Sequence, residues 1–115
     1  TILAISNKDI LIFGKGEEQR DHIHIDDVVK IIYCAAAKNL RGEYTLATGS
    51  VISFFDIAKI VKKLYNSKSK IIFQKRFGKM PHGGYRSFDN RKIKKMLKNF
   101  KFVKITDKNR DYLNV

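Results

Sequence analysis

The sequence is poor in several residue types, and each shortage excludes a class of protein. Cys34 is its single cysteine, so no disulfide can form within the chain. The neighbours of Cys34 in the run IIYCAAA are apolar, which predicts a small buried side chain in a reducing compartment. No apolar run approaches the ~20 residues that a membrane-spanning helix needs, and the first residues do not form a secretion signal. We therefore expect a cytoplasmic protein without a membrane segment.

Acidic residues are scarce in only one half of the chain. Residues 1–57 carry six Lys or Arg against eight Asp or Glu, whereas residues 58–115 carry 18 against three. The net charge of +13 therefore arises entirely from the second half. Such a basic region can attract nucleic acid, a membrane surface or a phosphorylated small molecule. Lysines scattered over solvated helix faces are the commonest cause of an excess of this kind.

The chain does contain enough apolar residues, 43% of 115, to form the core of one small domain. Its hydrophobic periodicity predicts strands and helices in alternation. The expected strands cover residues 9–14, 19–25, 43–49 and 70–74, and the expected helices cover residues 26–40, 53–64 and 89–100. About three helices and four short strands in this order indicate an α/β or mixed α+β fold.

Helix starts are marked by side chains that can accept a hydrogen bond from the first turn. Asp26 or Asp27 can cap the first helix, and Asp89 can cap the last. Ser53, with Asp56 three residues later, gives the clearest start signal in the chain.

Two glycines, Gly14 and Gly16, separate the first two expected strands. A glycine turn between an apolar run and residues 19–25 predicts a hairpin. The pair is not a dinucleotide-binding loop, because the third glycine is missing and a strand, not a helix, follows.

Arg20, His22, His24 and Asp26 alternate along the second expected strand, so they would share one face. Imidazole and carboxylate groups in this arrangement could hold a divalent ion, with His82 completing the set. However, no ligand cluster with an established spacing is present, Asp26 suits a helix cap, and Arg20 would repel a cation. We therefore favour a polar surface over a metal site.

Anion binding has better support. Arg20 lies on the same expected face, and the loop KRFGKMPHGGYRS brings Arg76 and Arg86. Guanidinium groups bind phosphate bidentately, and glycines in the loop let the backbone approach a ligand closely. The residues alone leave two interpretations open, a site for a phosphorylated small molecule and incidental surface charge.

Nucleic-acid binding is the third alternative, because aromatic residues are interleaved with basic ones in the second half. Phe73 falls in an expected strand, and Phe88 is placed to contact the last helix. Only Phe77 and Tyr85 are expected to be free to stack on bases, so a nucleic-acid partner is the weaker hypothesis.

An ordered set of segments resembles a known family. The segments are GKGEEQRDHIHIDDVVKII, EYTLATG, SFFDIAKIVKKL, KRFG and FDNRKIKKML. In this order they are similar to the C-terminal portion of the extended short-chain dehydrogenase/reductases, the NAD-dependent nucleotide-sugar epimerases and dehydratases. The likeness runs from about Ile10 to Phe100. Since the chain begins with Thr1, we expect residues 1–115 to be the C-terminal domain of a longer enzyme.

The resemblance implies a substrate-binding lobe beside an N-terminal Rossmann domain that holds NAD or NADP. The family arginine that contacts the substrate nucleotide or its diphosphate corresponds to Arg20, and the following aromatic position corresponds to His22. The diphosphate-binding arginine of the later loop corresponds to Arg76, with Arg86 as the second candidate. Family members often form homodimers through helices of the other domain.

The chain departs from the family pattern at several positions. Thr45 follows Tyr44 where the family often has Asn, His22 replaces a Phe or Tyr, and Lys79 stands where an acidic residue is frequent. The glycine-rich NAD loop and the catalytic Tyr-x-x-x-Lys pair are missing. The resemblance therefore implies a chain that is inactive alone, whose partners are a nucleotide-diphosphate sugar and the missing Rossmann domain. A basic nucleic-acid-binding module and a stand-alone interaction domain remain the alternatives.

Overall fold

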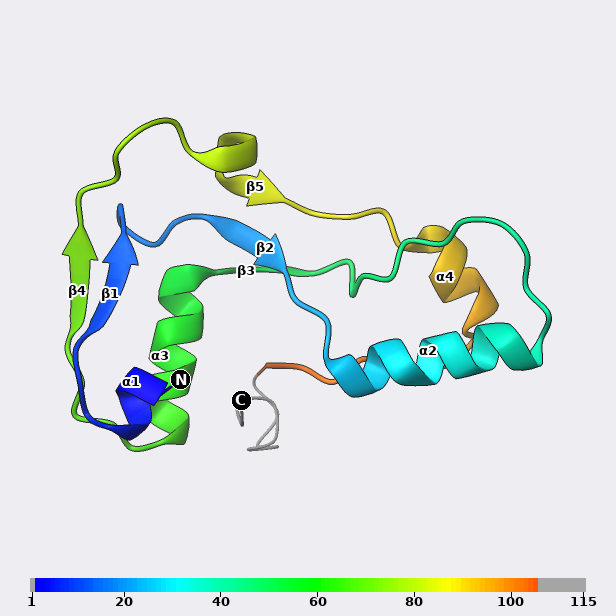
Figure 1. Ribbon diagram of the computed structural model, residues 1–115, viewed down its shortest axis with the longest axis horizontal. Helices are drawn as coiled ribbons and strands as arrows, with labels where there is room; N and C mark the ends of the chain where they lie inside the picture. Colours follow the sequence, from blue (N-terminus) through cyan, green and yellow to red (C-terminus); the bar gives the residue numbers. More distant parts are fainter. Residues whose placement is uncertain (1, 106–115) are drawn as a thin grey trace.

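Two small sheets and four helices make up the computed structural model, which describes residues 2–105 (Figure 1). The first sheet pairs β1 (Ile10–Phe13) with β4 (Ile71–Gln74), and the second has the order β3 (Val51–Ser53), β2 (Gln19–Asp21), β5 (Tyr85–Arg86). The helices are α1 (Ile2–Ile5), α2 (Ile25–Ala37), α3 (Phe54–Leu64) and α4 (Arg91–Met96), with a 3₁₀ helix η1 at Pro81–Gly84. The mixed α/β class expected from the sequence is confirmed.

The hairpin expected between the first two strands is wrong. β1 pairs in parallel with β4, so that Ile10 lies beside Ile71, and β2 pairs with β3 and β5 instead. β1 reads Ile-Leu-Ile-Phe and β4 reads Ile-Ile-Phe-Gln, the continuous apolar runs that are typical of parallel strands, whereas β2 reads Gln-Arg-Asp and suits the more polar sheet. The glycine turn therefore carries the chain from one sheet to the other.

The helix expected over residues 53–64 is confirmed as α3, which covers one face of the β1–β4 sheet. Ser53 is its N-cap, and the Ser53 hydroxyl oxygen accepts a hydrogen bond of 3.0 Å from the backbone N–H of Asp56. Ala58 and Val61 are buried, and the Phe55 ring lies 5.6 Å from the Phe73 ring of β4. The expected strand over residues 70–74 is confirmed by β4.

Helix α2 begins at Ile25, one residue before the expected start, and its N-cap is His24 and neither Asp26 nor Asp27. The His24 Nδ1 atom accepts a hydrogen bond of 3.2 Å from the Asp26 N–H. Asp27 is buried instead, where its carboxylate accepts a 2.8 Å hydrogen bond from the Val103 N–H. The helix ends at Ala37, before the expected residue 40.

A second apolar core lies between α2 and α4 and is formed by Ile31, Ile93 and Leu97. Residues 43–49 do not form the expected strand; their Tyr44 and Leu46 side chains pack against this core as a loop. The N-cap of α4 is Asn90 and not Asp89, although the Asp89 carboxylate does accept a hydrogen bond from the Arg91 N–H.

Within residues 2–105, no helix has both the length and the apolar character that crossing a bilayer requires.

Candidate functional site

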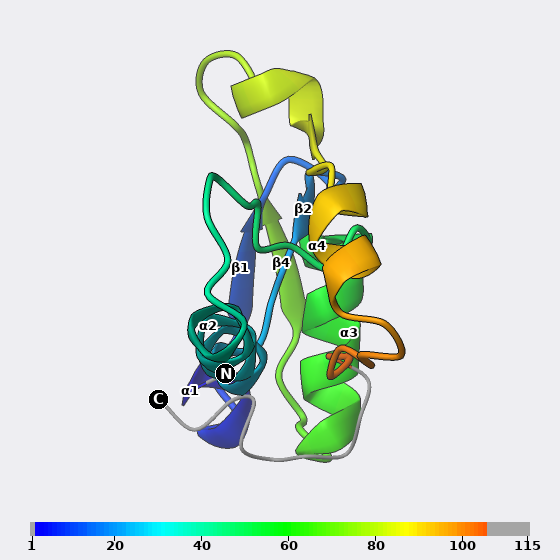
Figure 2. The same ribbon diagram turned by 90° about the vertical axis from the view of Figure 1, so that its right-hand side faces the viewer.

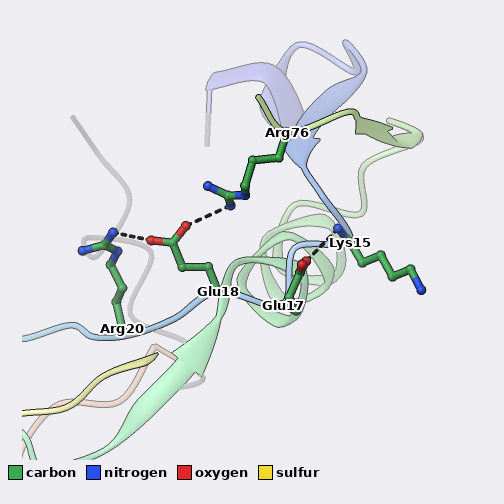
Figure 3. A network of polar contacts seen from close by, with 5 residues as sticks. All are labelled: Lys15, Glu17, Glu18, Arg20 and Arg76. Atoms are coloured by element: carbon green, nitrogen blue, oxygen red, sulfur yellow. Dashed lines mark hydrogen bonds and ion pairs between the residues drawn. The ribbon is translucent and has the colours of Figure 1, made fainter. Parts of the chain in front are cut away.

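Two of the four predicted site residues converge on one carboxylate (Figure 3). The Arg20 guanidinium pairs with Glu18 Oε1, and the Arg76 guanidinium donates a 2.9 Å hydrogen bond to Glu18 Oε2. Arg20 comes from β2 and Arg76 from the loop after β4, so only the fold brings them together. Glu18 is 5% exposed, whereas both arginine side chains keep part of their surface in solvent.

The turn that precedes Glu18 is fixed by the start of α3. The Phe55 N–H donates to the Gly16 carbonyl at 3.0 Å, and the Phe54 N–H donates to the Glu18 carbonyl at 3.1 Å. Gly16 has φ +70°, and a Cβ atom there would lie 2.9 Å from the Ile12 and Phe55 side chains. The glycine is therefore needed both for its left-handed backbone and for the close approach of α3.

Glu18 stays ionised between its two partners. Burial raises the pKa of the Glu18 carboxyl, but the hydrogen bonds and positive charges of Arg20 and Arg76 outweigh burial, and the pKa lies below its usual range. One carboxylate against two guanidinium groups leaves a net positive cluster. Each arginine has five N–H donors and spends only part of them on Glu18, so donors remain for an anion.

Arg86 lies beside this cluster in the sheet. The parallel pairing of β2 with β5 places Arg86 opposite Arg20, and partners in register share a sheet face. The Arg86 guanidinium is stacked 5.2 Å from the centre of the Phe88 ring. The structure therefore places three predicted site arginines in one region, with Arg86 at its more exposed edge.

A cavity of about 340 Å³ opens next to the cluster. Glu18 and Arg76 are its polar wall residues, and the rest of the wall is apolar. The apolar part comes from β1 and from α3: Ile10, Leu11, Ile12, Phe13, Phe54, Ile57, Ala58 and Val61. The cavity thus combines an apolar wall with the paired charges of Glu18 and Arg76.

His22 lies at the border of this region, not inside the arginine cluster. Its ring meets the Phe54 ring edge-on with 6.3 Å between centres, and it also lines a second cavity of about 670 Å³. The His22 Nε2 atom is buried without a hydrogen-bond partner among the described residues. Burial and, to a smaller extent, the Arg20 charge lower the pKa of His22, although the Asp21 carboxylate opposes them. Because β2 ends at Asp21 and His24 caps α2, the single strand face expected for positions 20–26 does not exist.

Asp21 has a role that the sequence reasoning missed. Its Oδ1 atom accepts hydrogen bonds from the Thr48 N–H at 3.1 Å and the Thr48 hydroxyl at 2.7 Å, and its Oδ2 atom accepts one from the Gly49 N–H at 2.7 Å. Asp21 therefore fastens the end of β2 to the loop that leads into β3.

Glu18 was missed as well, although the sequence carries a signal for it. Residues two apart on an extended chain point to the same side, so an acidic residue at 18 and an arginine at 20 can pair. The third member, Arg76, could not be paired with Glu18 by spacing, because 58 positions separate them.

Within residues 2–105, neither a metal nor a dinucleotide finds its usual binding elements. Among residues 2–105, no three His, Cys, Asp or Glu side chains lie close enough to hold a metal ion. The turn at Gly14 and Gly16 leads from β1 into β2, whereas a dinucleotide loop leads from a strand into a helix. The described residues therefore do not fit an NAD site, and we derive no chemical step from one.

The aromatic residues that nucleic-acid binding requires divide only in part as predicted. Phe77 is 87% exposed and Tyr85 is 57% exposed, as expected, but Phe73, which contacts Phe55, is itself 50% exposed. Phe88 lies under Arg86.

Comparison with known proteins supports the resemblance found in the sequence. A model of the NAD dependent epimerase/dehydratase family matches residues 2–47. An ADP-L-glycero-D-manno-heptose-6-epimerase of Brachyspira hyodysenteriae is 36% identical over 84 residues, which are 72% of this chain and 26% of that protein.

Solved structures share the fold. A UDP-glucose 4-epimerase of Thermotoga maritima, solved with UDP-glucose, has a TM-score of 0.68 at 21% identity over 81% of this chain and 29% of its own. A UDP-glucuronic acid 4-epimerase of Bacillus cereus, solved with NAD, has a TM-score of 0.72 at 24% identity over 91% of this chain and 33% of its own. This chain thus spans about a quarter to a third of the length of these relatives. It belongs to the extended short-chain dehydrogenase/reductase family of NAD-dependent epimerases and dehydratases.

Proposed function

We propose that residues 1–115 form the substrate-binding domain of an NAD-dependent nucleotide-sugar epimerase or dehydratase, and that Arg20 and Arg76 bind the diphosphate of the nucleotide sugar. The observation that carries this proposal is the convergence of Arg20 and Arg76 on buried Glu18. Bidentate guanidinium groups from two elements suit the two phosphates of a diphosphate. Arg86, in register with Arg20, adds a third positive group.

Glu18 acts as a positioning residue. It orients both guanidinium groups before a ligand arrives, which lowers the conformational cost of binding. The apolar cavity beside Arg76 offers a wall for a flat ring, such as the base of the nucleotide. The His22 ring contacts Phe54 of the cavity wall and lines the second cavity, and burial lowers its pKa and favours the neutral ring. His22 is a candidate for a contact with the uncharged part of the substrate.

The chemical step and the cofactor belong to residues outside this chain. No Tyr-x-x-x-Lys pair occurs in its sequence, and its glycine turn does not suit a dinucleotide. We accordingly propose that NAD or NADP binds to a separate Rossmann domain of the whole enzyme, and that the chain alone is inactive. The whole enzyme would act in carbohydrate biosynthesis in the cytoplasm, as an isomerase or a dehydratase.

Calorimetric titration of the chain with UDP-, GDP-, TDP- and ADP-sugars tests the assigned site. We expect weak binding of at least one of them, because part of the site comes from the other domain. Arg20→Ala and Arg76→Ala should each weaken that binding about tenfold or more, since each removes charged hydrogen bonds worth about 1.5–3 kcal/mol.

Arg91→Ala is the matched control, because it removes an equal charge from an exposed arginine that pairs only with Asp89 among the contacts described. It should leave the affinity within about twofold. If Arg20→Ala, Arg76→Ala and Arg91→Ala weaken binding equally, the binding depends on net charge and not on a specific site. Absence of binding to every nucleotide sugar would overturn the proposal.

Exposed Phe77 and Tyr85, within the basic half, favour a single-stranded nucleic acid as the second candidate. That ligand would bind with an affinity that falls steeply as salt rises, because bound counterions are released. A Phe77→Ala, Tyr85→Ala double variant should then lose affinity for an oligonucleotide and keep its affinity for nucleotide sugars. An oligonucleotide that is not retained even at low salt would exclude this candidate.

A further inference from the structure

The second cavity, of about 670 Å³, has no part in the function proposed above. Its volume lies in the range of roughly 300–1,000 Å³ that is typical of small-molecule sites. Residues of the segments 48–52 and 101–105 form two of its walls, and Lys94 and His22 also line it. Figure 2 shows α4 and the segment that follows it (orange) on the same side of the molecule as α3. Neither Arg20 nor Arg76 lines this cavity, so it is distinct from the arginine cluster.

Hydrogen bonds to two carboxylates fasten these walls to the rest of the fold. The Asp21 carboxylate accepts hydrogen bonds from the N–H and the hydroxyl of Thr48 in the first wall. The Asp27 carboxylate, which is 1% exposed, accepts a 2.8 Å hydrogen bond from the Val103 N–H in the second wall. Neither carboxylate lines the cavity itself. The cavity is therefore bounded by two segments that are tied to β2 and α2.

The charge of the cavity lining has one sign. Three lysines line it, Lys94, Lys101 and Lys104, and none of the described residues that line it is acidic. Lysine stems can lie along apolar surface while their ammonium groups stay in solvent, so positive charge can gather at the mouth of the cavity. The field of such a group of charges favours an anion.

The remaining lining is largely apolar. Val51 and Ile52 come from β3, and Phe102 and Ile105 come from the segment after α4. Small-molecule sites usually combine an apolar lining of this kind with a few polar groups that orient the ligand. The lining therefore suits a ligand with an apolar body and not a bare inorganic ion.

His22 supplies an independent sign of a ligand. It lines the cavity, and its Nε2 atom is buried without a hydrogen-bond partner among the described residues. Buried polar atoms that lack a partner in the protein are uncommon, and they usually pair with a water molecule, an ion or a ligand. A ligand that binds against the His22 ring is one source of such a partner.

We propose that this cavity binds a small organic anion, in which a carboxylate or phosphate is attached to a compact apolar body. The ammonium groups of Lys94 and Lys101 attract the anionic group, and Val51 and Phe102 contact the apolar body. The site is additional to the diphosphate site at Arg20 and Arg76 and does not depend on the function proposed for it.

NMR titration of the isotope-labelled 115-residue chain at constant ionic strength tests the site. The probes are phenyl phosphate, benzoate and inorganic phosphate, and the reporters are the amide signals of Ser50 and Val103, from the two walls. We expect both aromatic anions to shift these signals in a saturable way. Phenyl phosphate should bind about tenfold more tightly than inorganic phosphate, because its ring buries apolar surface. The tighter of the two aromatic anions identifies the preferred anionic group.

Two double variants with the same net charge separate the site from general electrostatics. The Lys94→Gln, Lys101→Gln variant should weaken phenyl phosphate binding about tenfold, since each substitution removes one exposed charge worth about threefold. The Lys95→Gln, Lys98→Gln variant is the matched control, because neither of these lysines lines the cavity. It should change the affinity by about twofold or less. Circular dichroism should show native helix content for both variants.

Three results would overturn the proposal. They are the absence of saturable shifts with both aromatic anions, equal weakening by the two double variants, and inorganic phosphate that binds as tightly as phenyl phosphate.

Arg76→Ala separates this site from the one proposed for nucleotide sugars. It should leave the response of Ser50 and Val103 to phenyl phosphate within about twofold, because Arg76 does not line this cavity. A response that Arg76→Ala abolishes would place the anion at the arginine cluster and overturn the second site. Saturable binding at Ser50 and Val103 by a chain that binds no nucleotide sugar would support the second site and refute the first.

Discussion

Helices α2 and α3 have similar lengths and similar N-terminal caps, but they differ in what surrounds them. α3 packs one side on the β1–β4 sheet and turns lysines such as Lys59 and Lys63 to solvent. α2 packs one side on the α4 core and turns Ile32 and Tyr33 to solvent. Helix α3 therefore has the single apolar side that is usual for a surface helix, whereas α2 has apolar residues on its exposed side as well.

The largest effect should come from the inner side of α2. Ile31→Ala should lower the free energy of unfolding by about 2–5 kcal/mol, because it leaves a cavity in the core with Ile93 and Leu97. Ile32→Ala, one position along on the outer side, should change it by about 0.5 kcal/mol or less. Urea unfolding followed by circular dichroism measures both. Equal losses would show that the two sides of α2 are packed alike in solution.

The cap of α3 should give the next largest effect. Ser53→Ala should cost about 1 kcal/mol of unfolding free energy, because the Asp56 N–H loses its acceptor. Ser53→Asn, which can still cap, should cost far less. If Ser53→Ala were neutral, the start of α3 would depend on its packing alone. The same urea titration serves for both variants.

Low pH should lower the stability of the folded chain through protonation of Glu18. The pKa of Glu18 is lowered in the folded chain, so its contribution to stability is complete above the ordinary carboxyl pKa near 4.3 and is lost as pH falls through the lower folded value. Glu18→Gln should remove that part of the pH dependence. Thermal unfolding between pH 7 and pH 3 measures it. Identical pH profiles for Glu18→Gln and the unsubstituted chain would contradict the ionised bridge.

Protonation of His22 should lower the stability of the folded chain at a higher pH than protonation of Glu18. Its folded pKa is lowered, so below its ordinary value near 6.5 the unfolded chain binds the proton first, and stability decreases as pH falls toward the folded value. His22→Phe should remove this slope between about pH 6.5 and the folded pKa. NMR titration of the His22 ring gives the folded value directly, and a value at or above 6.5 would refute a buried neutral ring.

The smallest effect on stability is expected at Asp89. The hydrogen bond from the Arg91 side chain lowers the pKa of this exposed carboxyl to about 2. Arg91→Ala should raise the carboxyl pKa toward its ordinary range in an NMR titration, while the hydrogen bond from the backbone N–H of residue 91 keeps part of the lowering. The unfolding midpoint should stay almost unchanged, because exposed ion pairs contribute little. A carboxyl pKa that does not change on substitution would show that the pair is not formed in solution.

Features that depend on neighbouring residues were predictable, and features that depend on distant ones were not. Ser53 and Asp56 predicted the start of α3, and the run at residues 70–74 predicted β4. The pairing of β1 with β4 could not be predicted, because a glycine turn between two extended runs indicates a hairpin unless the sheet topology is known.

The N-cap of α2 was also not predictable from neighbouring residues. Asp27 is a residue type that often caps helices, but its carboxylate accepts a hydrogen bond from the Val103 N–H, 76 positions away. His24 caps α2 in its place. The arginines of the site were identified by their residue type and family resemblance. Glu18, which joins them, became evident only when the fold had placed Arg76 against it.

The parallel pairing of β1 with β4 has a consequence for how the chain folds. Residue 10 finds its partner at residue 71, so this sheet cannot form until α2, β3 and α3 have been synthesised and the loop between the strands has closed. Until β4 has been synthesised, both edges of the apolar strand β1 lack a partner strand. During that time β1 is open to chaperones and to premature association. The order of assembly of this sheet is therefore set by β4, the strand that is synthesised last.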